Sequence, residues 1–124
     1  MPIKKEELDW ALQHWKTANY LASASIYLKD NFLLERPLLP NDIKDVLLGH
    51  WGTCPGLNFI YTHLNLLAYK TKESILPIIG PGHGFPAILA NDFIDGSLVK
   101  YYPELKNKKN KEQREIVQRK ERKH

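Results

Sequence analysis

Two histidines lie in glycine-containing breaks of this sequence. His50 stands in the stretch Gly49-His50-Trp51-Gly52, and His83 stands between Gly82 and Gly84. Flanking glycines let the backbone take unusual conformations and let a ligand approach closely. A histidine in such a loop can donate a hydrogen bond to a phosphate or hydroxyl oxygen, or move a proton near neutral pH. The pair therefore predicts a site for an oxygen-rich ligand.

Blander explanations also fit parts of this pattern. A single histidine in such a loop is more often structural or simply exposed, so the hypothesis depends on finding two in similar settings. Metal binding has little support, because the sequence has no CxxC or HxxxH spacing and no acid-rich cluster near the histidines. Cys54 could lie beside His50 as a second reactive group, but we interpret it as a small, buried hydrophobic residue. No nucleotide-binding fingerprint such as GxGxxG occurs.

Helical periodicity predicts the elements that position these loops. Apolar residues over 5–29 recur at spacings of three and four, which predicts a helix with one buried face and places His14 on its polar side. That face holds Leu8, Leu12, Trp15, Ala18, Ala22 and Ile26.

Three more helices are predicted between the loops and beyond them. Asn41 is a suitable N-cap for a short helix over 42–48. Pro55 suits the first turn of a helix over 55–70, and a third helix is expected over 84–92. The apolar face of the 55–70 helix would hold Leu57, Ile60, Tyr61, Leu64 and either Leu67 or Ala68.

An isoleucine-rich run over 75–79 predicts a short buried strand, although Pro77 is unusual in a central strand. Ligands of α/β proteins bind in loops at the carboxyl ends of parallel strands. We therefore expect an α/β fold class: a helix-rich piece of a parallel-sheet domain, with this strand left mostly without partners.

Length and composition fit one small globular domain. The chain has 124 residues, of which 43% are hydrophobic and 26% are charged. Its single cysteine excludes a disulfide within the chain and fits a reducing compartment. No stretch approaches the roughly 20 apolar residues of a membrane span, and the N-terminus has no apolar signal segment. We expect a cytoplasmic protein without a membrane partner.

The basic character of the chain belongs to its end. Residues 105–124 hold nine Lys or Arg and three acidic residues, whereas the net charge of the whole chain is +4. We divide the chain into a domain over 1–104 and a basic tail over 105–124, which we expect to be disordered or a frayed helix. This tail lacks aromatic residues for base stacking, which argues against nucleic-acid binding.

The same histidine loops carry a resemblance to a known family. The nineteen residues 47–65, Leu-Leu-Gly-His-Trp-Gly-Thr-Cys-Pro-Gly-Leu-Asn-Phe-Ile-Tyr-Thr-His-Leu-Asn, closely resemble a signature of the thiamine-diphosphate-dependent phosphoketolases, which are related to transketolase. Residues 78–84 resemble a second signature of that family, and residues 15–21 resemble its first helix. The resemblance covers about residues 8–105, and Phe85 departs from it where the family has a glycine.

The resemblance implies a function and a set of site residues. Phosphoketolases are carbon–carbon lyases (aldehyde-lyases) of carbohydrate metabolism, which cleave xylulose 5-phosphate, and often fructose 6-phosphate, with inorganic phosphate to acetyl phosphate and an aldose phosphate. They use thiamine diphosphate and Mg²⁺. By the resemblance, His50 and His83 are catalytic and contact the substrate near the reactive end of the cofactor. The residues implied to shape that wall are Trp51, Gly52, Thr53, Gly82 and Gly84.

The sequence also lacks features of the family. The Gly-Asp-Gly motif that holds magnesium and diphosphate does not occur, and neither does the domain that supplies the activating glutamate. We therefore expect an N-terminal piece that is inactive alone, binds neither thiamine diphosphate nor Mg²⁺ tightly, and ends in a foreign tail. The alternative is a small partner-binding protein that associates with an intact phosphoketolase subunit.

Overall fold

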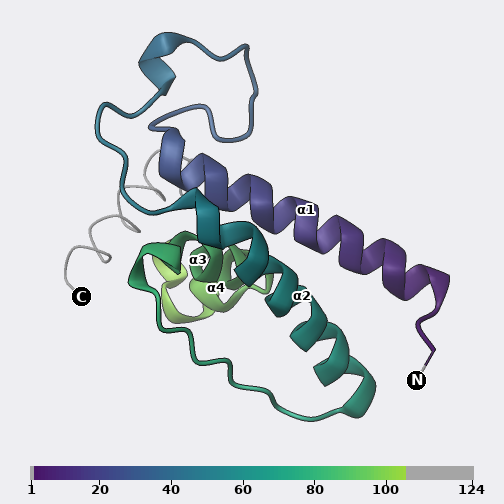
Figure 1. The fold of residues 1–124 in the computed structure, drawn as a ribbon. Coiled ribbons are helices and arrows are strands. Elements are labelled where there is room, and N and C mark those ends of the chain that lie inside the picture. The colour runs from purple at the N-terminus through teal and green to yellow at the C-terminus, as the bar shows by residue number, and fades with distance from the viewer. Residues whose placement is uncertain (1, 106–124) are drawn as a thin grey trace.

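The computed structural model describes residues 2–105, which fold into a small helical assembly. Helix α1 (Lys5–Tyr27) lies beside α2 (Cys54–Thr71), and the two run in opposite directions (Figure 1). Helix α3 (Phe85–Ile94) packs against both, and the short α4 (Ser97–Tyr101) follows it. The helices predicted over 5–29, 55–70 and 84–92 are confirmed.

The ends of α1 and α2 are held by local contacts. The backbone N–H of Lys4 donates to the carboxylate of Glu7 (2.8 Å), which satisfies a donor at the start of α1. The same carboxylate accepts a hydrogen bond from Lys70 Nζ (2.8 Å), so the start of α1 is tied to the last turn of α2. Pro55 lies in the first turn of α2, as predicted.

The helices meet along ridges of residues spaced four apart. In α1 the buried ridge is His14, Ala18, Ala22 and Ile26, and in α2 it is Cys54, Asn58, Thr62 and Leu66. The small residues among them, Ala18, Ala22 and Cys54, let the helix axes approach closely. The predicted faces were partly wrong, because Leu8 and Leu12 of α1 and Ile60 of α2 are exposed.

A chain of buried amides joins the three long helices. The prediction that His14 lies on a polar face was wrong: it is buried, and its Nε2 lies 2.9 Å from Asn91 Oδ1. Asn91 Nδ2 donates to Asn58 Oδ1 and to the carbonyl of Ala87, each at 2.9 Å. Asn58 Nδ2 in turn donates to Asn19 Oδ1 (2.9 Å). Because each buried polar group has a partner, the ridges tolerate these polar residues.

The helix predicted over 42–48 is wrong. Residues 43–48 are not helical, and the nearest element is a 3₁₀ turn over Pro40–Asp42. Asn41 lies inside this turn and caps no α-helix. The buried carboxylate of Asp42 accepts two hydrogen bonds from Arg36, both at 2.7 Å, and one from the backbone N–H of Leu39 (2.8 Å). The Arg36 guanidinium lowers the pKa of Asp42 to about 2. These contacts fold the 28–48 segment into a closed loop at one end of α1 (Figure 1).

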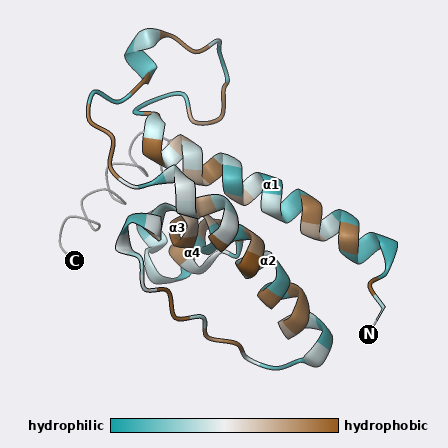
Figure 2. Ribbon diagram, viewed as in Figure 1, coloured by the Kyte–Doolittle hydropathy of each residue, from teal (hydrophilic) through white to brown (hydrophobic). Residues whose placement is uncertain are grey.

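The strand predicted over 75–79 is wrong for residues 2–105, and these residues do not show the parallel sheet to which it was expected to belong. Residues 72–81 run without regular structure below α2, and their apolar stretch is visible in Figure 2. Leu76 is 86% exposed and Ile78 is 92% exposed. An isolated bridge between Leu28 and Ile43 is the one β contact within residues 2–105. A strand needs a neighbour to accept and donate its backbone hydrogen bonds, and this segment has none here.

Within residues 2–105, none of the helices is both long and apolar enough to cross a membrane. The cytoplasmic location stays a prediction. The basic tail predicted over 105–124 lies outside the described residues, apart from residue 105, so the predicted domain boundary also stays untested.

Candidate functional site

The two histidine loops meet at one end of the helical assembly. The backbone N–H of His50 donates to the carbonyl oxygen of His83 (2.9 Å). Their imidazole rings lie edge to face, with centroids 5.2 Å apart and planes at 68°. Both residues are exposed. The prediction that the two side chains lie within a small ligand's width of each other is confirmed, although the residues are far apart in the sequence. That they face a concave region stays a prediction.

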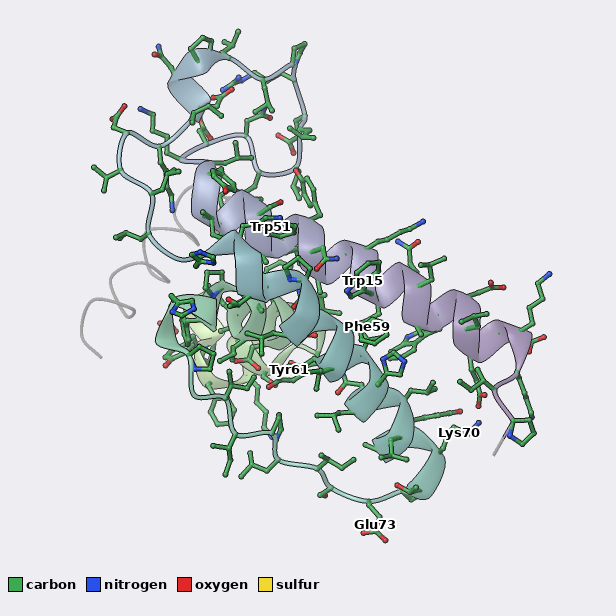
Figure 3. All side chains as sticks on the ribbon, viewed as in Figure 1. Trp15, Trp51, Phe59, Tyr61, Lys70 and Glu73 are labelled. Carbon is green, nitrogen blue, oxygen red and sulfur yellow. The ribbon has the colours of Figure 1, made fainter. Side chains whose placement is uncertain are left out.

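Each histidine directly precedes a helix. A 3₁₀ turn over Trp51–Thr53 leads from His50 into α2, and a second over Gly82–Gly84 contains His83 and leads into α3. The indole N–H of Trp15 donates to the carbonyl of Pro55 (3.0 Å), which fixes the first turn of α2 against α1 (Figure 3). Two helices therefore begin beside the histidines, and the positive ends of their dipoles favour a negatively charged ligand.

Two glycines are required by the packing of the His50 loop. Gly49 has a φ of +97°, and a Cβ there would lie 2.7 Å from Pro86 Cγ. Gly52 lies under the His50 ring, since a Cβ there would lie 2.4 Å from His50 Cε1. A side chain at position 52 would therefore displace the imidazole. This contact is a geometric reason for a glycine at position 52, and the part of Gly52 in a site stays a prediction.

The other predicted wall residues differ in how deeply they are buried. Trp51 is half-buried and packs on the core formed by Ala22, Ile26, Cys54, Ala87 and Ala90, so it supports the loop from inside (Figure 3). The Thr53 hydroxyl donates to the carbonyl of His50 (3.4 Å). Gly84 is buried against the side chains of Leu57 and Thr53, whereas Gly82 is exposed with open space around it.

Cys54 has a role at this site that the sequence did not reveal. Its side chain is fully buried, as expected. Its Sγ lies 3.1 Å from the carbonyl oxygen of His50, to which the thiol donates. Burial raises the pKa of this thiol, so it remains protonated and able to donate at neutral pH. The four-residue spacing from His50 to Cys54, at the start of a helix, is the sequence signal that could have indicated this contact.

The site offers imidazole chemistry rather than a metal-binding cluster. Among residues 2–105, no three His, Cys, Asp or Glu side chains gather as a metal site requires. Two adjacent, exposed imidazoles can donate hydrogen bonds to neighbouring oxygens of one ligand, or pass protons to and from them.

Comparisons with known proteins agree with the resemblance at these loops. Residues 2–119 match the family model described as the XFP N-terminal domain. The chain is 49% identical over 104 residues to a probable phosphoketolase 2 of Nostoc sp.. It is 49% identical over 104 residues to a probable phosphoketolase of Chlorobaculum tepidum, and 46% identical over 102 residues to one of Brucella abortus.

These matches cover most of this chain and little of each relative. The alignments span 82 to 84% of this chain. They span 13% of the length of each of these curated relatives. Nothing in the matches supports the alternative of a small partner-binding protein.

Proposed function

The chain belongs to the phosphoketolase family, and we propose that its two histidine loops form one wall of a phosphoketolase active site. The observation that carries this proposal is the apposition of the His50 and His83 rings at 5.2 Å, on exposed loops in front of two helices. The proposed reaction is the phosphorolytic cleavage of xylulose 5-phosphate or fructose 6-phosphate to acetyl phosphate and an aldose phosphate, a carbon–carbon lyase reaction of carbohydrate metabolism.

Each histidine has a proposed part in that reaction. His50 and His83 would donate hydrogen bonds to the hydroxyl and carbonyl oxygens of the sugar as charge develops on them, and would move protons during cleavage and dehydration. Two donors held side by side can act on neighbouring oxygens of one substrate. The positive dipole ends of α2 and α3 would favour the anionic sugar phosphate and inorganic phosphate at the same place.

The described residues fit one part of the family cofactor. Thiamine diphosphate, when bound, supplies the carbanion chemistry of the family reaction. His50 and His83 suit contact with its reactive end, because their exposed imidazoles carry donors suited to the oxygens that react there. Mg²⁺ and the diphosphate would be held by the part of the family enzyme that this chain does not span.

A chimeric enzyme tests this proposal. The part of this chain that aligns with the Nostoc relative would replace the matching segment of that protein; the two are 49% identical over 104 residues. We expect the chimera to form acetyl phosphate from xylulose 5-phosphate, phosphate, Mg²⁺ and thiamine diphosphate. A folded chimera that binds the cofactor and forms no acetyl phosphate would contradict the proposal.

A further inference from the structure

The sulfur of Cys54 lies between the two histidine loops. Its thiol donates to the carbonyl of His50, 3.1 Å away, on one side. On the other side, the same sulfur lies against the backbone of Ala87, in the first turn of α3. Cys54 and Ala87 are both fully buried in one apolar cluster. A single buried atom therefore contacts the His50 loop and the helix that follows His83.

These contacts close a ring through both loops. The His50 N–H donates to the His83 carbonyl, and the chain then passes through Gly84 into α3 as far as Ala87. From Ala87 the ring returns through the sulfur to the His50 carbonyl. The peptide groups on both sides of His50 are thus fixed relative to the His83 loop. A hydrogen bond in a dry, packed setting constrains geometry more strongly than an exposed one.

The ring of His50 is fixed from a third direction. It lies across Gly52, where a Cβ would approach its Cε1 to 2.4 Å. The Cys54 thiol holds the backbone of His50, and the bare backbone of Gly52 sets the direction of the His50 side chain. The Thr53 hydroxyl reaches the same His50 carbonyl at 3.4 Å, a longer contact than that of the thiol.

We infer that Cys54 is a positioning residue, whose buried sulfur sets the distance between His50 and His83. Cys54 affects catalysis only if His50 and His83 act as described under the proposed function, on which this part of the inference rests. Its structural content, that one thiol couples the two loops, stands independently of any activity. Cys54 touches no substrate in this account and acts only through the two histidines.

The 124-residue chain itself provides the test. Two substitutions separate hydrogen bonding from size: Cys54→Ser keeps a donor and acceptor at the position, and Cys54→Ala removes both. Thr62→Ala is the matched control, because the Thr62 hydroxyl is also buried in α2 and donates to the carbonyl four residues earlier, that of Asn58 (2.8 Å). NMR would measure the ring-to-ring NOE between His50 and His83 and the hydrogen-exchange rate of the His50 amide.

In Cys54→Ala we expect the NOE to weaken and exchange at the His50 amide to rise about fivefold or more, the factor of one typical hydrogen bond. That rise should exceed any rise at the amide of Ala18, which is fully buried in the middle of α1 outside the Cys54 cluster and is the reference for global stability. Cys54→Ser should keep both signals close to those of the unchanged chain, and Thr62→Ala should leave the NOE intact. Three results would overturn the inference. Cys54→Ala could keep both signals, the Ala18 and His50 amides could accelerate by the same factor, or Cys54→Ser could behave like Cys54→Ala. Because no cofactor or substrate is present, an inactive chimera would leave these results unaffected, so the two proposals fail separately.

Discussion

The backbone N–H of His50 donates to the carbonyl oxygen of His83 at 2.9 Å, so these residues are joined through their main chains as well as through their rings. A contact between rings alone could be lost by a rotation of either side chain. The main-chain hydrogen bond fixes the two loops to each other before any ligand arrives. Groups held in place in advance need no reorganisation during a reaction.

The close approach of Gly49 to Pro86 predicts opposite effects for two glycine substitutions. Gly49→Ala should lower the free energy of unfolding by about 1–3 kcal/mol, because a residue with a Cβ is strained at a φ of +97° and meets Pro86 Cγ at 2.7 Å. Gly56→Ala, in the first turn of α2 with open space around it, should raise it by up to about 1 kcal/mol. Urea unfolding followed by circular dichroism measures both, and equal effects would contradict the packing described for Gly49.

The buried amide chain predicts a large cost for removing Asn91. Asn91→Leu should lower the free energy of unfolding by about 2–5 kcal/mol, because it leaves the Nε2 of His14 and the Oδ1 of Asn58 buried without partners. Gln13→Ala, an exposed polar substitution in α1, should change it by less than about 0.5 kcal/mol. Chemical denaturation of both variants checks this, and a cost for Asn91→Leu no larger than for the control would count against the network.

The Arg36–Asp42 contact predicts a specific acid dependence. The pKa of Asp42 is lowered to about 2 from an ordinary 3.8, so its contribution to stability is present above about pH 4 and is lost as the pH falls toward 2. Asp42→Asn should therefore lower the thermal midpoint near neutral pH, and the difference from the unchanged chain should shrink over that window. Asp45→Asn is the control, because the Asp45 side chain is 91% exposed and its ion pair with Lys29 is longer, at 3.6 Å. A difference for Asp42→Asn that stays constant from pH 6 to 2 would rule this explanation out.

The isolated chain should not catalyse the family reaction. The purified 124 residues, mixed with xylulose 5-phosphate, phosphate, Mg²⁺ and thiamine diphosphate, should give no acetyl phosphate above background. Loss of one preorganised group typically costs 10²–10³ in rate, and the histidine wall is one part of the site. Calorimetric titration with the cofactor should show no tight binding. Acetyl phosphate formed by chain free of host enzyme would show that this wall suffices for catalysis.

Features with a local cause were predicted well from the sequence. The three long helices follow from periodicity, with Pro55 and Pro86 in the first turns of α2 and α3. The meeting of His50 and His83 has no local cause, and it was expected from the family resemblance. The helix predicted over 42–48 does not form because the carboxylate of Asp42 accepts hydrogen bonds from Arg36 and Leu39, which closes a loop where the first turn of a helix was expected.

The remaining errors concern contacts between distant segments. The 75–79 run has the composition of a strand, but a strand exists only beside another one, and residues 2–105 provide no such neighbour for it. His14 was assigned from apolar spacing, whereas its burial depends on Asn91, 77 residues further along the chain. The contact of Cys54 with the His50 carbonyl likewise depends on how a loop turns into a helix, which residue types alone do not show.

The most direct measurement of the central claim is the rate of acetyl phosphate formation by the chimeric enzyme with each histidine replaced in turn. His50→Asn and His83→Asn should each lower kcat by about 10²-fold or more. His63→Asn is the matched control, since His63 is exposed on α2 against Phe59 and should keep the rate within a few-fold. Rates for His50→Asn and His83→Asn close to that of the control would contradict the account.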